Sequence, residues 1–261
     1  MTIQSVKRAI DILSLFSFSQ PALGIAEISR MMQLPKPTVH GLVQTLHQEG
    51  LLNQDAETRK YSIGLKVVEL GALLAGNLKI NQIASELVQR LALNTQQNAR
   101  IAIWNNNTML ITLNLFPAVE FPQFQQIGPR VPAYCTGIGK AVLSTLTETE
   151  MDEYLQQTPL FCFTQETITD REQLIQSLKE IKECGYATEK GEFLSGMGSV
   201  AVPVYDLSGK AVGAISLSGT PDILLEKLHP DLASQLIRTG IEVSRRMGYR
   251  PETLPFHIKP D

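Results

Sequence analysis

The stretch IAEISRMMQLPKPTVHGLVQTLHQEG, residues 25–50, decides the fold of the N-terminal part of this chain. Residues 25–32 have a helical pattern, and Leu34-Pro35-Lys36-Pro37 then interrupts the chain. A proline in this position suits the first turn of a new helix. That helix places Val39, Leu42, Val43 and Leu46 on one face, and Gly50 suits its end. Two short helices around a tight break, the second with a polar outer face, predict a helix-turn-helix.

The residues on either side complete this unit. Upstream, residues 5–17 carry apolar side chains at helical spacing and predict a first helix. Downstream, residues 51–54 and 60–63 read as two short strands around a turn at 55–59. Three helices followed by a hairpin predict a winged helix-turn-helix over residues 1–64.

Residues 65–79 form the next segment, which we interpret as a linker helix. Its apolar side chains lie on more than one side of the expected helix, at Leu65, Val67, Val68, Leu70, Leu73, Leu74 and Leu78. A helix that is apolar on several sides needs more than one packing partner. We therefore expect it to pack on its own domain and on a second chain; an ordinary core helix is the alternative.

Residues 80–250 predict a second domain, followed by a tail at 251–261. Helical patterns run over 81–96, 138–146, 171–184 and 231–247, with a further helix starting after the capping sequence Thr147-x-x-Glu150. Extended segments are expected at 100–104, 109–115, 121–127, 186–189, 199–205 and 211–218. Helices flanking an antiparallel sheet make the fold class α+β.

Net charge, cysteine content and the length of apolar runs limit the classes of function that this chain can have. The 261 residues carry a net charge of −3, which taken alone disfavours binding to nucleic acid. The first 78 residues hold seven Lys/Arg and six Asp/Glu, so the negative excess lies in the remainder. Three scattered cysteines and no apolar run of about 18–20 residues predict a cytoplasmic protein without a membrane span, metal site or cofactor.

The ordered set of motifs along residues 4–250 resembles the IclR family of bacterial transcription regulators. The resemblance rests on residues 5–13 (SVKRAIDIL), on Leu34-Pro35-Lys36, Thr38-Val39-His40 and Tyr61-Ser62-Ile63-Gly64, on residues 132–141 (PAYCTGIGKA), on residues 201–206 (AVPVYD) and on residues 214–219 (AISLSG). It implies a DNA-binding winged helix, a GAF-like domain that binds a small effector, and a homodimer or homotetramer. Such proteins repress or activate operons for the breakdown of small organic and aromatic acids.

The helix-turn-helix supplies the candidate DNA-binding residues. The second of its helices is expected in the major groove, where Gln44 suits adenine and threonine methyl groups suit thymine. Lys36 and the hairpin residues suit phosphate or the minor groove. The family commonly has arginine at the position of Gly41, so this chain lacks one candidate guanine or phosphate contact. The full candidate set is Lys36, Thr38, His40, Gly41, Gln44, Thr45, Arg59 and Lys60; an exposed helix face without function is the alternative.

The second domain supplies the candidate effector residues. Glycines ahead of a helix expose backbone N–H groups, which favours a ligand carboxylate beside Gly137. Ser216 and Ser218 alternate along a strand and therefore point to the same side. The resemblance adds Ile138, Glu189 and Ser199, with Ile138 at a position where small residues are frequent. The alternative is that these glycines only shape a turn and that the serines bond to backbone.

The expected mechanism is linkage, in which an effector favours one arrangement of the oligomer and changes the spacing of the two DNA-reading helices. Three other possibilities remain open. The first is an enzyme, because Cys135 precedes a helix and a helix N-terminus can activate a thiol. A protein-binding module that does not bind DNA is the second, and a vestigial pocket is the third.

Overall fold

The computed structural model describes residues 2–117, 128–227 and 229–250, and the chain divides into two compact units, Met1–Asn77 and Leu78–Asp261. The predicted extended segment at 121–127 and the predicted tail at 251–261 lie outside the described residues. Each unit is described by itself below.

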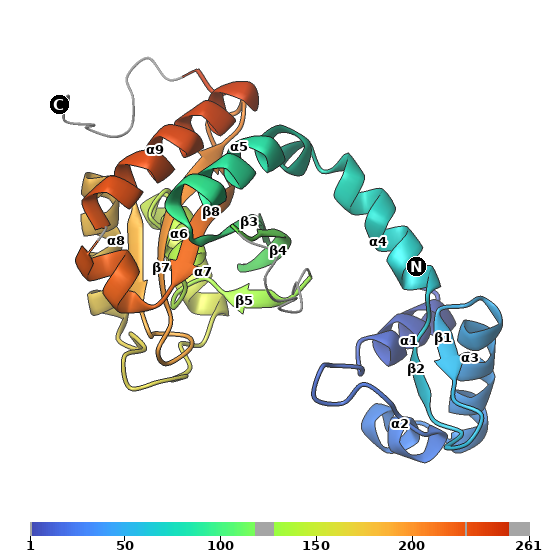
Figure 1. Cartoon of the computed structure of the whole chain (residues 1–261). Helices are drawn as coiled ribbons and strands as arrows, with labels where there is room; N and C mark the ends of the chain where they lie inside the picture. The colour runs from blue at the N-terminus through green and yellow to red at the C-terminus, as the bar shows by residue number, and fades with distance from the viewer. Residues whose placement is uncertain (1, 118–127, 228, 251–261) are drawn as a thin grey trace. The chain divides into compact units, whose positions relative to one another are not determined.

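The first unit is a helix-turn-helix with a two-stranded wing (Figure 1). The wing strands pair antiparallel, with Asn53 opposite Ser62. The first helix ends at Leu13 rather than at the predicted residue 17, although Leu15 and Phe16 still pack against the core. The elements are α1 (Gln4–Leu13), α2 (Ile25–Met32), α3 (Lys36–Gln48), β1 (Leu52–Gln54), β2 (Tyr61–Ile63) and α4 (Lys66–Asn77).

Local hydrogen bonds fix the turn between α2 and α3. The Glu27 carboxylate accepts from the Gly24 N–H at 2.7 Å and so caps the start of α2. Gln33 ends α2 in the left-handed region at φ 53°, and the Ser29 hydroxyl donates to the Leu34 carbonyl at 2.6 Å. These contacts orient α3 so that one face is buried and the other is exposed. The buried core of the unit is Ile12, Leu23, Ile28, Val39, Val43, Leu46, Leu52 and Tyr61.

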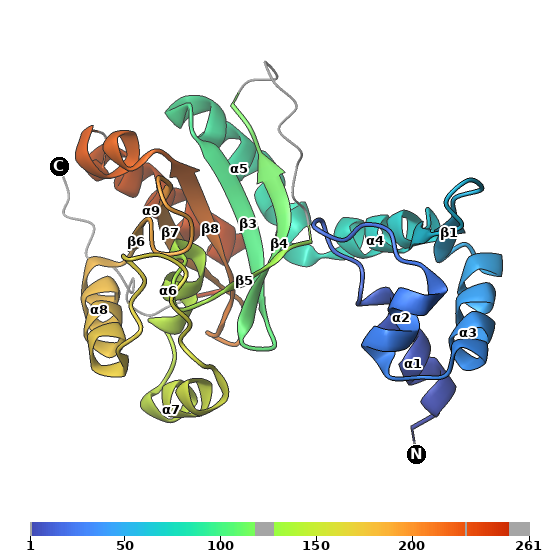
Figure 2. The same ribbon diagram turned by 90° about the horizontal axis from the view of Figure 1, so that it is seen from below.

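The second unit is an α+β domain built on one antiparallel sheet with strand order β5-β4-β3-β8-β7-β6 (Figure 2). The other predicted strands and helices of this unit are present, with ends shifted by a few residues, and the segment at 121–127 lies outside the described residues. The short strand β5 and the helical turn at Asp222–Lys227 were not predicted. The elements are α5 (Lys79–Thr95), β3 (Asn98–Asn105), β4 (Thr108–Leu115), β5 (Arg130–Pro132), α6 (Gly137–Leu143), α7 (Glu148–Gln157), α8 (Arg171–Cys184), β6 (Ala187–Lys190), β7 (Gly198–Tyr205), β8 (Ala211–Gly219) and α9 (His229–Arg246).

Turn and cap residues act as the sequence predicts. Asn106 and Asn107 both have positive φ, at 51° and 59°, and close the β3–β4 hairpin. The Thr147 and Glu150 side chains form the predicted reciprocal cap of α7, and the Asp170 carboxylate accepts from the Gln173 N–H at 2.9 Å to start α8. Within the described residues, no helix is both long enough and apolar enough to span a bilayer.

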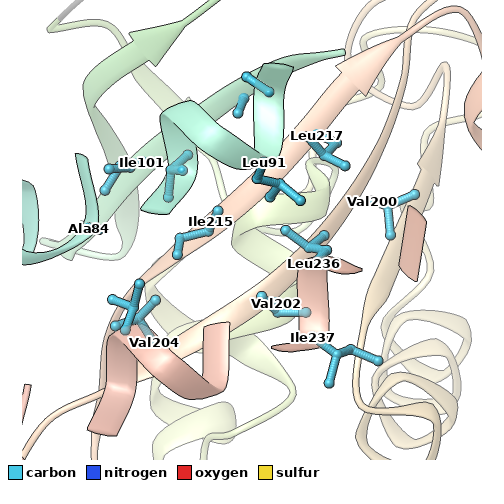
Figure 3. Packing of buried hydrophobic residues seen from close by; sticks show 14 of the residues in the cluster. Ala84, Leu91, Ile101, Val200, Val202, Val204, Ile215, Leu217, Leu236 and Ile237 are labelled. Carbon is cyan, nitrogen blue, oxygen red and sulfur yellow. The ribbon is translucent and has the colours of Figure 1, made fainter. Parts of the chain in front are cut away.

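The two faces of the sheet have different characters. Helices α5 and α9 cover the first face, where branched side chains from alternate strand positions, including Ile101, Val202 and Ile215, form the main core (Figure 3). The other face packs against α6, and its alanines allow that helix to lie close to the strands: Ala102, Ala187, Ala201 and Ala214. Further along, the same face becomes polar, and this is where the cavity of the second unit lies.

Candidate functional site

Helix α3 presents a polar face outward. Lys36, Thr38, His40, Gly41 and Thr45 are exposed, and Gln44 is half-buried. The Thr45 hydroxyl donates to the Gly41 carbonyl at 3.0 Å, so the polar end of that side chain is already used within the helix. The six candidate residues of α3 therefore form one surface, on the side of the helix opposite Val39 and Val43.

Gly41 lies at an open point of this surface. A side chain built there meets nothing within 4 Å. Packing within the unit therefore does not require a glycine at this position, and the position has room for a larger side chain.

The wing places Arg59 and Lys60 at the tip of the β1–β2 hairpin, where both are exposed. Arg59 has a left-handed backbone, φ 58°, after a turn that the Asp55 carboxylate holds by accepting from the Thr58 N–H at 2.7 Å. Lys60 lies 3.4 Å from the Glu27 carboxylate in an exposed ion pair. Exposed pairs contribute little free energy, so this contact leaves Lys60 available for a phosphate.

We expect the Arg59→Ala and Lys60→Ala variants each to weaken binding to a duplex from the protein's own promoter. Each lost phosphate contact should also reduce the slope of log K against log salt by about 0.9. Fluorescence anisotropy titrations at several salt concentrations measure both effects. Lys179→Ala, at an exposed position of α8, is the matched control. An unchanged affinity and slope in both wing variants would exclude the wing from the interface.

The two histidines of α3 differ in their surroundings. His40 is exposed, whereas His47 is half-buried, with its Nδ1 atom 3.1 Å from the Leu52 carbonyl and its ring 6.1 Å from that of Tyr61. Two histidines without a third ligand favour a surface or DNA-facing position over metal binding; His40 fits this expectation, whereas the half-buried His47 joins α3 to the wing. Among the described residues, no group of three His, Cys, Asp or Glu side chains is placed to hold a metal ion.

The second unit contains a cavity of about 330 Å³ on the face of the sheet that α6 covers. The structure brings all six candidate effector residues to its walls: Gly137, Ile138, Glu189, Ser199, Ser216 and Ser218. Strand pairing explains the arrangement, because Glu189 lies opposite Ser199 and Ser199 lies opposite Ser218. The apolar part of the lining comes from β4, β5 and the loops beside the sheet: Ile111, Pro129, Val131, Phe193, Leu194 and Met197.

Four further polar residues of the cavity lining are absent from the effector set that the sequence predicts: Arg100, Asn114, Arg130 and Thr136. Arg100 is paired with Ser216 on one side and Asn114 on the other, and its Nε atom donates to the Asn114 Oδ1 atom at 3.0 Å. The sequence did contain a signal for Arg100. It is a charged residue between the apolar Ala99 and Ile101, in a segment that is predicted to be a strand. We call Glu189, Ser199, Ser218, Ser216, Arg100 and Asn114 the polar strip.

Glu189 is buried at the end of the polar strip farthest from Asn114. Its Oε1 atom accepts from the Glu192 N–H at 2.6 Å, and its Oε2 atom accepts from the Ser199 hydroxyl at 3.2 Å. Burial raises the pKa of Glu189, and these hydrogen bonds only partly oppose the effect. The ionised carboxylate is therefore less stable in the folded protein than in the unfolded chain.

A pH dependence of stability follows. Because the pKa of Glu189 is raised on folding, the folded state holds a proton that the unfolded state has lost, and stability falls as pH rises through this interval above about 4.5. Glu189→Gln keeps the acceptor for Glu192 and removes the titration. We expect the variant to gain stability relative to the wild type as pH rises from 5 toward 8, measured by urea unfolding. Parallel pH profiles of the two proteins would contradict this assignment; Glu183→Gln, at an exposed position, is the control.

The glycines before α6 have separate roles. A Cβ at Gly137 would lie 2.5 Å from the Ser199 hydroxyl oxygen and would fill cavity space, whereas a Cβ at Gly139 would overlap the Ala133 backbone. Gly139 is therefore required for packing. Helix α6 has only seven residues, so the predicted attraction of an anion to its N-terminus is a smaller effect than the side-chain charges of the cavity.

The sequence suggests a solvated or a structural role for Lys140 and Arg130, and both have structural roles in the second unit. Arg130 does hold the β3–β4 hairpin, donating to the carbonyl and side-chain oxygens of Asn105. Lys140 is almost fully buried and forms an ion pair with the buried Glu192 carboxylate. This pair joins α6 to the segment that follows β6, which carries Phe193 and Leu194 of the cavity wall.

Cys135 is not an activated nucleophile. The side chain is fully buried, and burial together with the nearby Glu192 and Glu189 charges raises the pKa of its thiol to about 12. The thiolate required for nucleophilic chemistry is therefore scarce at neutral pH. This removes the feature on which the enzyme hypothesis depended.

A second hollow of about 360 Å³ lies between α7 and α8. Its charged side chains, Glu148, Asp152, Lys179 and Lys182, are all exposed. The sheet cavity differs because buried polar side chains from several strands converge in it, which is the usual character of a ligand site. We therefore place the candidate ligand site in the sheet cavity.

Comparison with known proteins finds a matching family model for each of the two units. The family model for the IclR helix-turn-helix domain matches residues 5–56, and the model described as "Bacterial transcriptional regulator IclR C-terminal" matches residues 72–245. The HTH-type transcriptional regulator XynR of Escherichia coli (strain K12) is 33% identical over 247 residues, covering 95% of this chain and 98% of that protein.

Solved structures show the same fold. An IclR transcriptional regulator from Alicyclobacillus acidocaldarius matches with a TM-score of 0.83 and 23% identity, covering 95% of this chain and all of the other. An IclR homologue from Microbacterium hydrocarbonoxydans, complexed with 4-hydroxybenzoate, matches with a TM-score of 0.78 and 21% identity over 94% of this chain and 99% of its own. The two family models together span most of the sequence, and the chain belongs to the IclR family of bacterial transcriptional regulators.

Proposed function

We propose that this regulator's binding to operator DNA is controlled by a small organic acid held in the sheet cavity. The observation that carries the proposal is the polar strip, because its side chains come from strands spread between residues 100 and 218 and line one cavity. The 4-hydroxybenzoate complex of the Microbacterium homologue supports a small acid as the ligand class.

In the first unit, we assign DNA contact to α3 and to the wing. Gln44 and the methyl groups of Thr38 and Thr45 are the base-reading candidates, and His40 and Gly41 complete the groove-facing surface. Lys36, Arg59 and Lys60 contact phosphate in this assignment. Sequence preference comes from few side chains, so the pairing of two half-sites by an oligomer supplies much of the specificity.

Helix α4 supports the oligomer. It has no buried residue in the chain by itself, and Leu70, Leu73 and Leu74 are each more than half exposed. An apolar surface of this kind is stable in water only when another surface covers it. A second copy of the chain provides that cover in a homodimer, from which a homotetramer can form. Because α4 joins the two units in sequence, it is also the natural carrier of the coupling between effector and DNA.

A thermal-shift screen of small carboxylic acids tests the cavity. We expect at least one acid to raise the melting temperature of the wild type. That shift should disappear in a protein with Ser216→Ala, Ser218→Ala and Gly137→Val together, because the valine side chain enters the space beside Ser199. A hit whose effect survives in the triple variant would show that the ligand binds elsewhere.

The regulator acts in the cytoplasm in this proposal, where both operator and metabolite are present.

A further inference from the structure

Arg100 places a positive charge in the wall of the sheet cavity. The side chain is half-buried, and its Nε atom is held by Asn114 at 3.0 Å. Within the described part of the chain, its two terminal nitrogens make no hydrogen bond to another protein group. A guanidinium stays charged in proteins and presents its donors as a planar fork that matches a carboxylate. The wall therefore contains a preformed partner for an anion.

Glu189 places a negative charge three strands away from Arg100 in the same sheet. Strands lie about 4.8 Å apart, so the two backbones are separated by about 14 Å, and both side chains line the same cavity. Burial lowers the pKa of Arg100, and the nearby Glu189 charge partly opposes this effect. The two groups therefore interact. Between the two charges lie the hydroxyls of Ser216, Ser218 and Ser199.

The order of groups along the polar strip is cation, hydroxyls, carboxylate. A complementary ligand carries a carboxylate at one end and neutral hydrogen-bonding groups along its length, ending in a donor that Glu189 accepts. The cavity of about 330 Å³ lies at the small end of the roughly 300–1,000 Å³ that ligand pockets span, which limits the ligand to a small molecule.

We propose that Arg100 binds the effector's carboxylate and that the serines and Glu189 select an acid bearing several hydroxyl groups, that is, a polyhydroxylated carboxylate. This inference rests on the proposed effector function and narrows its ligand class. The Glu189 oxygens and the Ser199 and Ser218 hydroxyls already have protein partners, but hydroxyls and carboxylates accept or donate more than one hydrogen bond. A hydroxylated acid can use this remaining capacity, whereas a plain acid offers these groups no hydrogen-bond partner. An amino acid would use the two charges but would leave the hydroxyls between them unmatched.

Isothermal titration calorimetry with the full chain tests the proposal. The probes are four- and six-carbon aldonates of several configurations, such as L-threonate and D-gluconate. Butanoate and hexanoate lack the hydroxyls, erythritol and glucitol lack the carboxylate, and threonine tests the amino acid. We expect at least one aldonate to bind 10-fold or more tightly than every other class.

Variants then assign the contact. We expect Arg100→Gln to weaken aldonate binding by about 10- to 100-fold, because a charge-assisted, two-pronged contact is lost. Arg100→Lys should recover part of the loss, since it restores the charge without the fork. Arg90→Gln, which removes the same charge from an exposed position of α5, should bind like the wild type. The fluorescence melting curve of Trp104, the single tryptophan, checks that each variant is folded.

The outcomes separate this inference from the broader proposal. If plain acids bind as tightly as aldonates, or if Arg100→Gln binds aldonates like the wild type, the inference is overturned while control by an organic acid stands. If no acid binds and the protein still binds its promoter, both fall. Binding by threonine above all other probes would replace the hydroxy acid with an amino acid.

Discussion

Replacing Lys140 with methionine is expected to lower the free energy of unfolding of the second unit by about 3–5 kcal/mol. The Lys140 and Glu192 side chains are 3% and 9% exposed, so the variant leaves a carboxylate buried without its counter-charge. Burial already raises the pKa of Glu192, and Lys140 is the group that opposes this effect. Urea unfolding followed by the fluorescence of Trp104 measures the loss, because this tryptophan lies on β3 and reports the second unit alone.

Two further variants distinguish the ion pair from a general effect of the substitution. Lys179→Met makes the same change at an exposed position of α8 and is expected to stay within about 0.5 kcal/mol of the wild type. The double variant Lys140→Met with Glu192→Leu removes both charges and should recover most of the stability, as apolar replacement of a buried pair generally does. A loss below about 1 kcal/mol in Lys140→Met would contradict the description of the pair as buried and mutually dependent.

Replacing Leu70 and Leu74 of α4 with glutamate is expected to convert the proposed oligomer to a monomer and to weaken operator binding by at least about 100-fold. The two side chains are 51% and 58% exposed in the single chain and lie one helical turn apart. Two charges in the covered surface would oppose association strongly, and a monomer binds one half-site without the advantage of a linked second one. Sedimentation equilibrium and anisotropy titration of the same sample measure both effects.

The position of the charge provides the control. Ala72→Glu adds an acidic residue to α4 about 200° around the helix from Leu70. The new charge therefore lies on the side of the helix away from Leu70 and Leu74. This variant should remain oligomeric and should bind operator nearly as well as the wild type. If the Leu70→Glu and Leu74→Glu protein stays oligomeric, α4 is not the surface that joins the chains.

The sequence predicts the first unit well because its signals are local. The prolines near the start of α3 and the apolar spacing of Val39, Val43 and Leu46 act within a few residues of the chain. The caps of α7 and α8 in the second unit are local signals of the same kind. The end of α1 was misplaced because Leu15 and Phe16 continue an apolar pattern while packing from a non-helical segment. Apolar spacing reports burial, and burial does not require a helix.

The candidate site was predicted only in part because it depends on strand register. The positions of Ser216 and Ser218 on one side of a strand follow from alternation alone. The contact of Arg100 with Asn114 depends on the pairing of β3 with β4, which includes an irregularity between Ile101 and Ala102 that no local signal announces. The burial of Lys140 depends on Glu192, 52 positions later in the chain. Long-range partners of this kind are set by tertiary packing.

The most direct test of the central claim is one titration of the protein on a fluorescent duplex from its own promoter, with and without an acid that the thermal-shift screen identifies. We predict salt-dependent binding by the wild type and a change in operator affinity of at least about 10-fold when the acid is present, which corresponds to a coupling free energy of about 1.4 kcal/mol. The change should be absent in the Ser216→Ala, Ser218→Ala, Gly137→Val protein. An acid that binds the cavity yet leaves operator affinity unchanged would contradict the account.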